Sequence, residues 1–433
     1  MEPLKVDEVL QNDYFLHIIL EHLSDDLWGG SDRVKLHRTI LHTCSLVNRR
    51  FSVESNRILY RQISFIDIFS RQTLAWTLMS YFRTIKSRPI YGAYCIKLFI
   101  RDSGSLGKAI FSDLIPFLPN LQRLAIPSAD QYTLSKLLNS CLNLEVLRFS
   151  PEDNDDVGTP YLQTLIERQA TSLKTLCLVN ASFDEYVNKL FEYCTTLQLV
   201  RLEHCKFNAS LSALALHGFE KLHRLEVINC TSPGFDDFLL DLTHSLDDLH
   251  EIELQGKGVL SDKVLDLFAQ HVGPTLRKVQ LSRIARISDR GLERLVTSAC
   301  KLEHLRIRSC RTDEALFERV AASRFENPSL THFEFRGFTP LSLDVLVAMT
   351  VIFPNLQCLE VTIERTKPAN LPIGITSLAR LHTLRVEYVL TDEAEDTDMD
   401  WEIIRADLQR LFATMPSLVC VEWNKLLVER RMG

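Results

Sequence analysis

One pattern of apolar residues recurs along most of the chain and restricts what it can fold into. In "KLEHLRI", Leu302, Leu305 and Ile307 are separated by a gap of three residues and then by a gap of two. A half-buried strand alternates strictly, and an amphipathic helix repeats every three or four residues, so neither produces this spacing by itself. It indicates a turn that leads into a short strand, with all three side chains pointing inward.

The same L-x-x-L-x-L frame, with related apolar residues at some places, recurs at intervals of 23 to 37 residues. A period in the twenties with this signature is typical of leucine-rich repeats. Each repeat then supplies one short strand and a return segment, and stacked repeats bury what a single repeat cannot. The frames begin at residues 95, 121, 144, 173, 197, 222, 249, 276, 302, 330, 356, 381 and 418.

The return segments have the spacing of amphipathic helices. In "ISDRGLERLVTSAC", Leu292, Leu295 and Val296 share one helical face, and Ser288 or Asp289 is placed to cap the N-terminus. The segments "FDEYVNKLFEYC" and "LSDKVLDLFAQHV" repeat this pattern. We therefore expect an α/β leucine-rich-repeat solenoid, with parallel strands on the concave face and helices on the convex face.

The cysteines follow the same repeat. Each of Cys205, Cys230 and Cys310 lies eight residues after a first leucine, where the chain leaves a strand. Another three, Cys141, Cys194 and Cys300, lie two or three residues before a first leucine, where a helix ends. We expect both places to be interior slots for a small, weakly polar side chain. Residues 288–310 resemble the cysteine-containing subclass of leucine-rich repeats most closely.

Composition excludes several classes of protein. The 433 residues are 46% hydrophobic and carry a net charge of −7, so no overall basic charge favours nucleic acid. No apolar run approaches the roughly 18–20 residues that span a bilayer, and the N-terminal "MEPLKVDEVLQND" lacks the pattern of a secretory signal. We expect an intracellular protein, cytoplasmic and/or nuclear, with no nucleic-acid or membrane partner.

The first 92 residues do not carry the repeat frame. "DYFLHIILEHL" (13–23) has the spacing of a short amphipathic helix, and "SDDLWGGSD" after it is typical of a loop. Apolar positions in 37–63 then indicate two more helices on either side of "SVES". We divide the chain into a helical module at 8–63, a helical linker and cap at 64–92, a solenoid of 12–13 repeats at 93–425 and a tail at 426–433.

The run "CSLVNRRF" with "ILYRQI" downstream resembles the second half of the F-box, a module of three short helices. The first half departs from that family, because Gln11-Asn12 stands where Leu-Pro is usual. The resemblance implies a substrate-recognition subunit of an SCF-type (Skp-cullin-F-box) ubiquitin ligase, which binds a Skp-type adaptor and through it a cullin scaffold. The residues that it assigns to adaptor contact are Leu16, Ile19, Leu20, Leu23, Leu46, Val47, Phe51, Leu59 and Tyr60.

Two other interpretations of this N-terminal region stay open. Residues 1–92 can simply cap the solenoid, because a terminal repeat needs a polar-faced cap over its core. The chain can equally be a repeat scaffold that binds a partner outside any ubiquitin ligase.

The outward positions of the frame form a candidate binding face. Residues two, four and six after a first leucine point away from the core, and neighbouring strands lie about 4.8 Å apart. Arginine suits bidentate pairing with carboxylate or phosphate, so a basic set here indicates a protein substrate with an acidic or phosphorylated segment. Alternatively, interspersed arginine and glutamate only keep the sheet soluble. The basic set is Lys278, His304, Arg306, Arg308, His332 and Arg336, and an acidic counterpart upstream is Glu226, Glu251 and Glu253.

Catalytic motifs are missing from the sequence. It contains no GxGxxG or GxxxxGK[ST] phosphate loop, no HExxH and no GxSxG. The segment "HSLDDLH" (244–250) combines histidine with aspartate, but it runs from a helix end into a strand, so we expect its side chains to diverge. The sequence therefore predicts a binding subunit that is not an enzyme and holds no cofactor or metal.

Overall fold

The structure is a computed structural model of the chain. The described residues belong to two compact units, Met1–Ala181 and Ser182–Gly433. The ranges described are 41–46, 49–65, 71–100, 104–126, 130–150, 158–183, 194–207, 219–230, 235–256, 261–284, 287–312, 314–323, 325–337, 340–363, 375, 378–388, 401–423 and 426–429.

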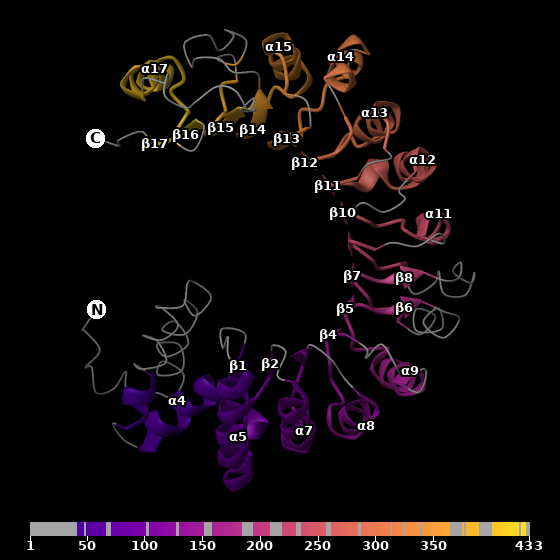
Figure 1. Cartoon of the computed structure of the whole chain (residues 1–433), viewed down its shortest axis with the longest axis vertical. Helices are drawn as coiled ribbons and strands as arrows, with labels where there is room; N and C mark the ends of the chain where they lie inside the picture. The colour runs from indigo at the N-terminus through magenta and orange to yellow at the C-terminus, as the bar shows by residue number, and fades with distance from the viewer. Residues whose placement is uncertain are drawn as a thin grey trace, which may run out of the picture. The chain divides into compact units, whose positions relative to one another are not determined.

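In the first unit, parallel strands follow one another in chain order and helical segments connect them (Figure 1). The strands are β1 (Gln62–Ser64), β2 (Lys97–Phe99), β3 (Arg123–Ala125), β4 (Val146–Phe149) and β5 (Thr175–Val179). The helices are α4 (Arg49–Arg61), α5 (Arg71–Ser87), α6 (Pro89–Tyr94), α7 (Gly104–Leu114), η2 (Ile115–Phe117), α8 (Gln131–Ser140) and α9 (Gly158–Gln169).

The second unit repeats this arrangement, with strands along the inner side of an arc and helices along its outer side (Figure 1). Its parallel strands are β7 (Leu199–Glu203), β9 (Arg224–Ile228), β10 (Glu251–Gln255), β11 (Lys278–Ser282), β12 (His304–Arg308), β13 (His332–Arg336), β14 (Cys358–Ile363), β15 (Thr383–Tyr388) and β16 (Cys420–Trp423). Its helices are α11 (Phe235–Thr243), α12 (Asp262–His271), η4 (Gly273–Thr275), α13 (Asp289–Ser298), α14 (Ala315–Ala322), α15 (Leu343–Ile352) and α17 (Trp401–Thr414).

Smaller strands depart from the predicted boundaries. β1 pairs with β2, so the sheet begins at Gln62, inside the predicted module 8–63 and ahead of the predicted solenoid start at 93. At the other end, β17 (Leu426–Glu429) pairs antiparallel with β16, so part of the predicted tail 426–433 closes the sheet. A separate two-stranded sheet joins β6 (Ser182–Phe183) and β8 (Lys206–Phe207).

The repeat frame sets the core of the second unit. On β12, Leu305 and Ile307 are buried, whereas His304, Arg306 and Arg308 are half-exposed on the other face. The same register continues from strand to strand, so equivalent apolar residues stack on one another. The large, mostly parallel sheet and its helices form an α/β fold consistent with a leucine-rich-repeat solenoid. The first leucine of every frame here is at most 1% exposed: Leu197, Leu222, Leu249, Leu276, Leu302, Leu330, Leu356, Leu381 and Leu418.

Polar side chains before the frame connect successive repeats. A serine or threonine next to a first leucine donates its hydroxyl to the carbonyl of the previous repeat's first leucine, which would otherwise be buried without a partner. These bonds are Ser172 Oγ to Leu144 O at 3.0 Å, Thr275 Oγ1 to Leu249 O at 2.8 Å and Ser417 Oγ to Leu381 O at 3.0 Å.

The predicted helices of the return segments are present where the structure describes them. The predicted helix break at "SVES" (52–55) is wrong, because α4 continues through it from Arg49 to Arg61. α13 covers the segment after Ser288, whose hydroxyl accepts a hydrogen bond from the Gly291 N–H, so Ser288 is the predicted N-cap. α12 matches the prediction for 260–272, whereas residues 184–193 of the third predicted helix lie outside the described residues. Among the described helices, none is both long and apolar enough to cross a bilayer.

Five of the six repeat-linked cysteines lie in interior slots, as predicted: Cys141, Cys194, Cys205, Cys230 and Cys310 are buried. The prediction for Cys300 is wrong, because its side chain is exposed. α13 ends at Ser298, and the fully buried Ala299 fills the interior position instead. Cys300 then follows in the turn and points outward.

Candidate binding face

The inner face of the second unit carries a hollow over β11–β14. Its volume is about 170 Å³. Four of the six predicted substrate-binding residues line it, namely Lys278, His304, Arg306 and His332. The parallel register explains this gathering, because Lys278, His304 and His332 are partners on adjacent strands. The other two predicted residues, Arg308 and Arg336, lie further along β12 and β13 and do not line the hollow.

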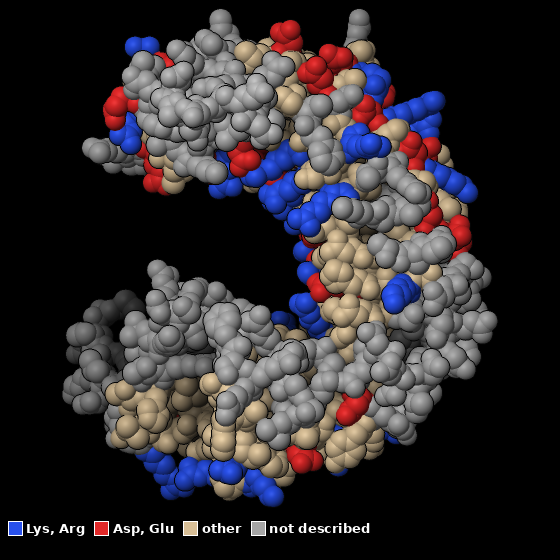
Figure 2. Space-filling view, viewed as in Figure 1, with Lys and Arg blue, Asp and Glu red and all other residues tan. Residues whose placement is uncertain are grey.

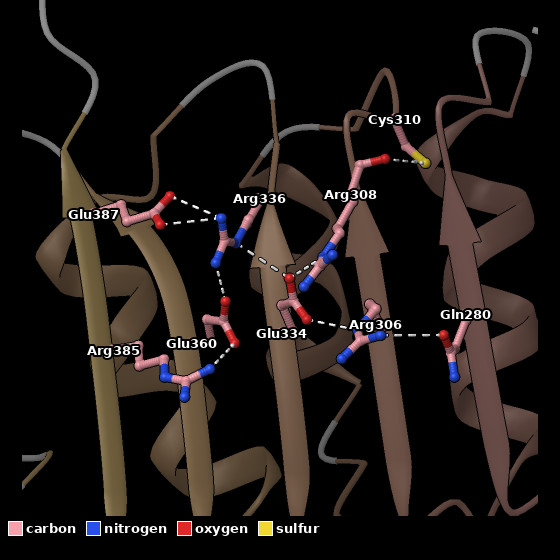
Figure 3. Close-up of polar contacts among 9 residues, drawn as sticks. All are labelled: Gln280, Arg306, Arg308, Cys310, Glu334, Arg336, Glu360, Arg385 and Glu387. Carbon is pink, nitrogen blue, oxygen red and sulfur yellow. Dashed lines mark hydrogen bonds and ion pairs between the residues drawn. The ribbon is translucent and has the colours of Figure 1, made fainter. Parts of the chain in front are cut away.

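Glu334 on β13 holds three arginines of this face (Figure 3). Its carboxylate forms ion pairs with Arg306 at 2.6 Å, with Arg336 at 3.1 Å and with Arg308. Although Glu334 occupies an outward strand position, it is only 5% exposed because the arginine side chains cover it. Arg306 also donates from Nη1 to Gln280 Oε1 at 3.3 Å. These contacts fix the guanidinium groups on the side that faces the sheet, and each guanidinium group remains partly exposed to solvent.

Arg336 belongs to a second cluster of carboxylates. It pairs with Glu360 on β14 and with Glu387 on β15 at 3.0 Å (Figure 3). Burial lowers the pKa of Arg336, but the charges and hydrogen bonds of Glu360, Glu387 and Glu334 outweigh burial and raise the pKa above its ordinary value. Arg336 is therefore less available to bind a partner than Arg306 or Arg308, because it pairs with three carboxylates of its own chain.

The hollow itself is lined by two cations, Lys278 and Arg306, and by two carboxylates, Glu334 and Glu360. An excess of cations appears only over the whole strands β11–β13. The outward positions of β11, β12 and β13 carry Lys278 and three arginines against the single carboxylate of Glu334. Figure 2 shows lysine and arginine side chains gathered along this inner face of the second unit. Lys278 lies 3.7 Å from Glu251 on β10, at the limit of an ion pair, so its charge is only weakly offset.

Two histidines form one wall of the hollow. The rings of His304 and His332 pack against each other with centroids 4.2 Å apart and their planes tilted by 31°. Burial lowers the pKa of both imidazoles, and for His304 the neighbouring His332 and Lys278 lower the pKa further. Both rings are consequently neutral at pH 7, and they offer polar nitrogens rather than charge.

Two of the three residues of the predicted acidic counterpart upstream, Glu226 and Glu251, form ion pairs. Glu226 is buried between Arg201 at 2.8 Å and Arg224 at 2.5 Å, and Arg224 also pairs with Glu251 at 3.0 Å. Arg201 and Arg224 are not among the predicted site residues, although both occupy outward positions of their frames. Acidic and basic side chains therefore alternate along most of the inner face. Basic side chains outnumber acidic ones at the outward positions of β11 and β12.

The structure places four of the nine predicted adaptor-contact residues. Leu46 is 74% exposed. Phe51 and Leu59 pack against a small core of Leu41 and Ile58. The ring of Tyr60 stacks on Tyr91 of α6, with centroids 4.6 Å apart, and on Tyr81 of α5 at 5.7 Å. The other five, Leu16, Ile19, Leu20, Leu23 and Val47, lie outside the described residues.

Comparison with known proteins adds little to this picture. No family model matches the chain, and no curated protein matches it. Among solved structures, the chain is similar to a crystal structure of a complex of Rad7 and Elc1 in yeast. That similarity has a TM-score of 0.44 at 15% identity and covers 90% of this chain and 92% of the other.

Proposed function

We propose that this chain is the substrate-recognition subunit of an SCF-type ubiquitin ligase. In this proposal the N-terminal helices bind a Skp-type adaptor and through it a cullin, and the inner face of the second unit captures a protein. The chain itself performs no catalysis and acts in the cytoplasm, the nucleus or both. The F-box resemblance of "CSLVNRRF" and "ILYRQI" supports the adaptor half of the proposal.

The hollow over β11–β14 is the observation that carries the substrate half. Arg306 and Lys278 line it, and Glu334 and Gln280 hold the guanidinium of Arg306 in place. A fixed guanidinium loses less conformational entropy when it binds a carboxylate or a phosphate. The substrate segment that fits is therefore extended and acidic or phosphorylated, with one anionic group in the hollow.

The adaptor half is tested by co-expression of the full chain with a Skp-type adaptor, followed by gel filtration. Leu46→Asp changes a side chain that is largely exposed, so the variant should fold while losing the complex. Val351→Asp is the matched control, because Val351 is also exposed, at 61%, but lies on α15 of the second unit. If the wild-type chain is folded and forms no complex, the alternative of a scaffold outside a ubiquitin ligase replaces this proposal.

The substrate half is tested with a fluorescein-labelled peptide rich in glutamate and phosphoserine, by fluorescence anisotropy. We expect Arg306→Gln to weaken binding roughly tenfold or more, because a charge-assisted hydrogen bond contributes about 1.5–3 kcal/mol. Arg277→Gln is the control, since Arg277 is exposed, precedes β11 and pairs with Glu303 away from the hollow. Equal losses in the two variants would show non-specific charge attraction and contradict the proposed site.

A further inference from the structure

Two histidines occupy the same position in neighbouring repeats of the second unit. His223 directly precedes β9 and His250 directly precedes β10, and the register of the two strands places them side by side. The His250 N–H donates to the His223 carbonyl at 2.9 Å, and the two rings stack with centroids 5.4 Å apart. The backbone of the sheet therefore brings the two imidazoles together.

A carboxylate completes the cluster, so the expectation that the side chains of 244–250 diverge is wrong for Asp248 and His250. One oxygen of Asp248 lies 3.2 Å from Nε2 of His223, and the other lies 3.8 Å from Nε2 of His250. One ligand atom from each of the three residues lies within 4.8 Å of the others. A tetrahedral ion with bonds of about 2.0–2.1 Å requires ligand atoms about 3.3 Å apart. The distance between Asp248 and Nε2 of His223 already matches that spacing, and side-chain rotation has to shorten the longer distances.

The hydrogen bonding of His223 is compatible with metal binding. Nδ1 of His223 lies 2.6 Å from the Lys221 carbonyl and can donate its proton there, which leaves Nε2 as the nitrogen that binds a metal ion. Donation of the second ring N–H to a backbone carbonyl is the usual support of a histidine ligand. In His250, Nδ1 is buried and has no hydrogen-bond partner among the described residues, so no such bond fixes its tautomer.

Two nearby arginines are engaged elsewhere. Arg224 pairs with Glu226 and Glu251 on the inner face, and Arg277 pairs with Glu303 at 3.3 Å. The side chains of His223 and Asp248 are about half exposed, so an ion can reach them from solvent.

We propose that His223, Asp248 and His250 form a binding site for a divalent transition-metal ion of the zinc type. Two imidazoles and one carboxylate are a donor set that zinc accepts, and they leave the fourth tetrahedral position open to water or to a side chain of a bound protein. Because the ligands come from two repeats, the ion would clamp the starts of β9 and β10 together. This site lies outside the hollow and does not depend on the proposed ligase function.

Zinc binding by the full chain is measured by equilibrium dialysis with ZnCl₂ alone. We expect the double variant His223→Ala/His250→Ala to lose one zinc ion per chain. The matched control is His244→Ala/His271→Ala, because these rings also meet in adjacent repeats, with centroids 5.0 Å apart, but they are not part of the cluster with Asp248. Asp248→Asn keeps the shape of the side chain and should weaken zinc binding by more than about tenfold.

Cobalt substitution separates this site from the chain's thiols. With Co²⁺ in place of zinc, we expect the visible absorption of a nitrogen and oxygen site, without the near-ultraviolet band of a cobalt–thiolate bond. A thiolate band, an unchanged stoichiometry in the folded His223→Ala/His250→Ala variant, or a wild-type chain that binds no zinc would each overturn the proposal. Circular dichroism of all variants establishes that they are folded.

Discussion

The ring of His304 on β12 packs against the ring of His332 on β13 at an angle of 31°, and the two rings form a neutral pair beside the cationic side chain of Lys278. Burial from both sides lowers the pKa of each ring below its ordinary value of 6.5. The charged groups that act on His304 are Lys278 on β11, which lowers its pKa, and Glu303 and Glu251, which raise it. This pair makes the stability of the second unit sensitive to pH.

Stability should fall in mild acid because of this pair. With a lowered pKa in the folded state, the unfolded chain binds more protons as the pH drops below 6.5. The stabilisation from the neutral rings is therefore fully present above about pH 6.5 and is lost as the pH falls through the lower folded-state pKa values. Urea unfolding at pH 7.5 and pH 5.5 measures this loss, which should be smaller in His304→Gln/His332→Gln. An identical loss in that variant would assign the pH dependence to other groups.

Glu334→Gln should destabilise the second unit by about 1–2 kcal/mol. Glu334 is buried under Arg306, Arg308 and Arg336, and the substitution removes the charge that all three share. The cost stays moderate because the arginine heads remain in contact with water. Glu303→Gln removes an exposed ion pair with Arg277 and should cost less than about 0.5 kcal/mol. Chemical denaturation of both variants decides whether Glu334 has this supporting role.

Gly256→Ala should cost about 1–3 kcal/mol of folding stability. Each of the strands β7, β9, β10, β11 and β12 is followed by a residue with positive φ, and Gly256 has the most extreme value, +133°. An added Cβ would lie 2.8 Å from the Asn229 Cα of the neighbouring repeat. At the equivalent turn, Arg283 has a φ of 58°, so Arg283→Gly should be close to neutral. Thermal unfolding of the two variants compares the turns, and a Gly256→Ala protein as stable as wild type would contradict the expectation.

Asn327→Ala should cost about 1–3 kcal/mol, because it removes two hydrogen bonds of a fully buried side chain. Nδ2 of Asn327 donates to the Ala299 carbonyl at 3.0 Å, and its Oδ1 accepts from the Ser329 N–H. Asn355→Ala is the matched control. Nδ2 of Asn355 also donates to a carbonyl, that of Pro328 at 2.9 Å, but in an exposed setting where water replaces the lost bond. Equal unfolding free energies for the two variants would show that the burial of Asn327 has no energetic consequence.

Cys300 should be alkylated ahead of the interior thiols at pH 8. Burial raises the pKa of the Cys141 and Cys194 thiols to about 12, so almost no reactive thiolate forms there, whereas the side chain of Cys300 is exposed. Brief treatment with iodoacetamide, followed by peptide mass spectrometry, identifies the order of modification. Early labelling of Cys141 or Cys194 in the folded protein would contradict the interior slots assigned to them.

The repeat architecture could be predicted from the sequence because it depends on local, periodic information. The spacing of three and then two residues at Leu302, Leu305 and Ile307 determines which side chains of a turn and a strand are buried. Because this spacing recurs, it also determines how the repeats stack on one another. The N-cap at Ser288 is equally local, since its partner Gly291 lies three residues away. The ladder of outward positions follows from the same register, which is why four predicted residues meet in one hollow.

Only the tertiary structure decided which outward side chains work together. The sequence assigns Glu334 and Arg306 to an exposed face, but packing across adjacent strands buries the glutamate beneath the arginines and fixes their direction. Likewise, Asp248 and His250 lie close in sequence, whereas His223 joins them from the preceding repeat only because β9 and β10 are in register. The repeat period determines which positions face outward. Burial, charge pairing and possible metal ligation depend on side-chain directions across strands, and no local pattern in one chain encodes those.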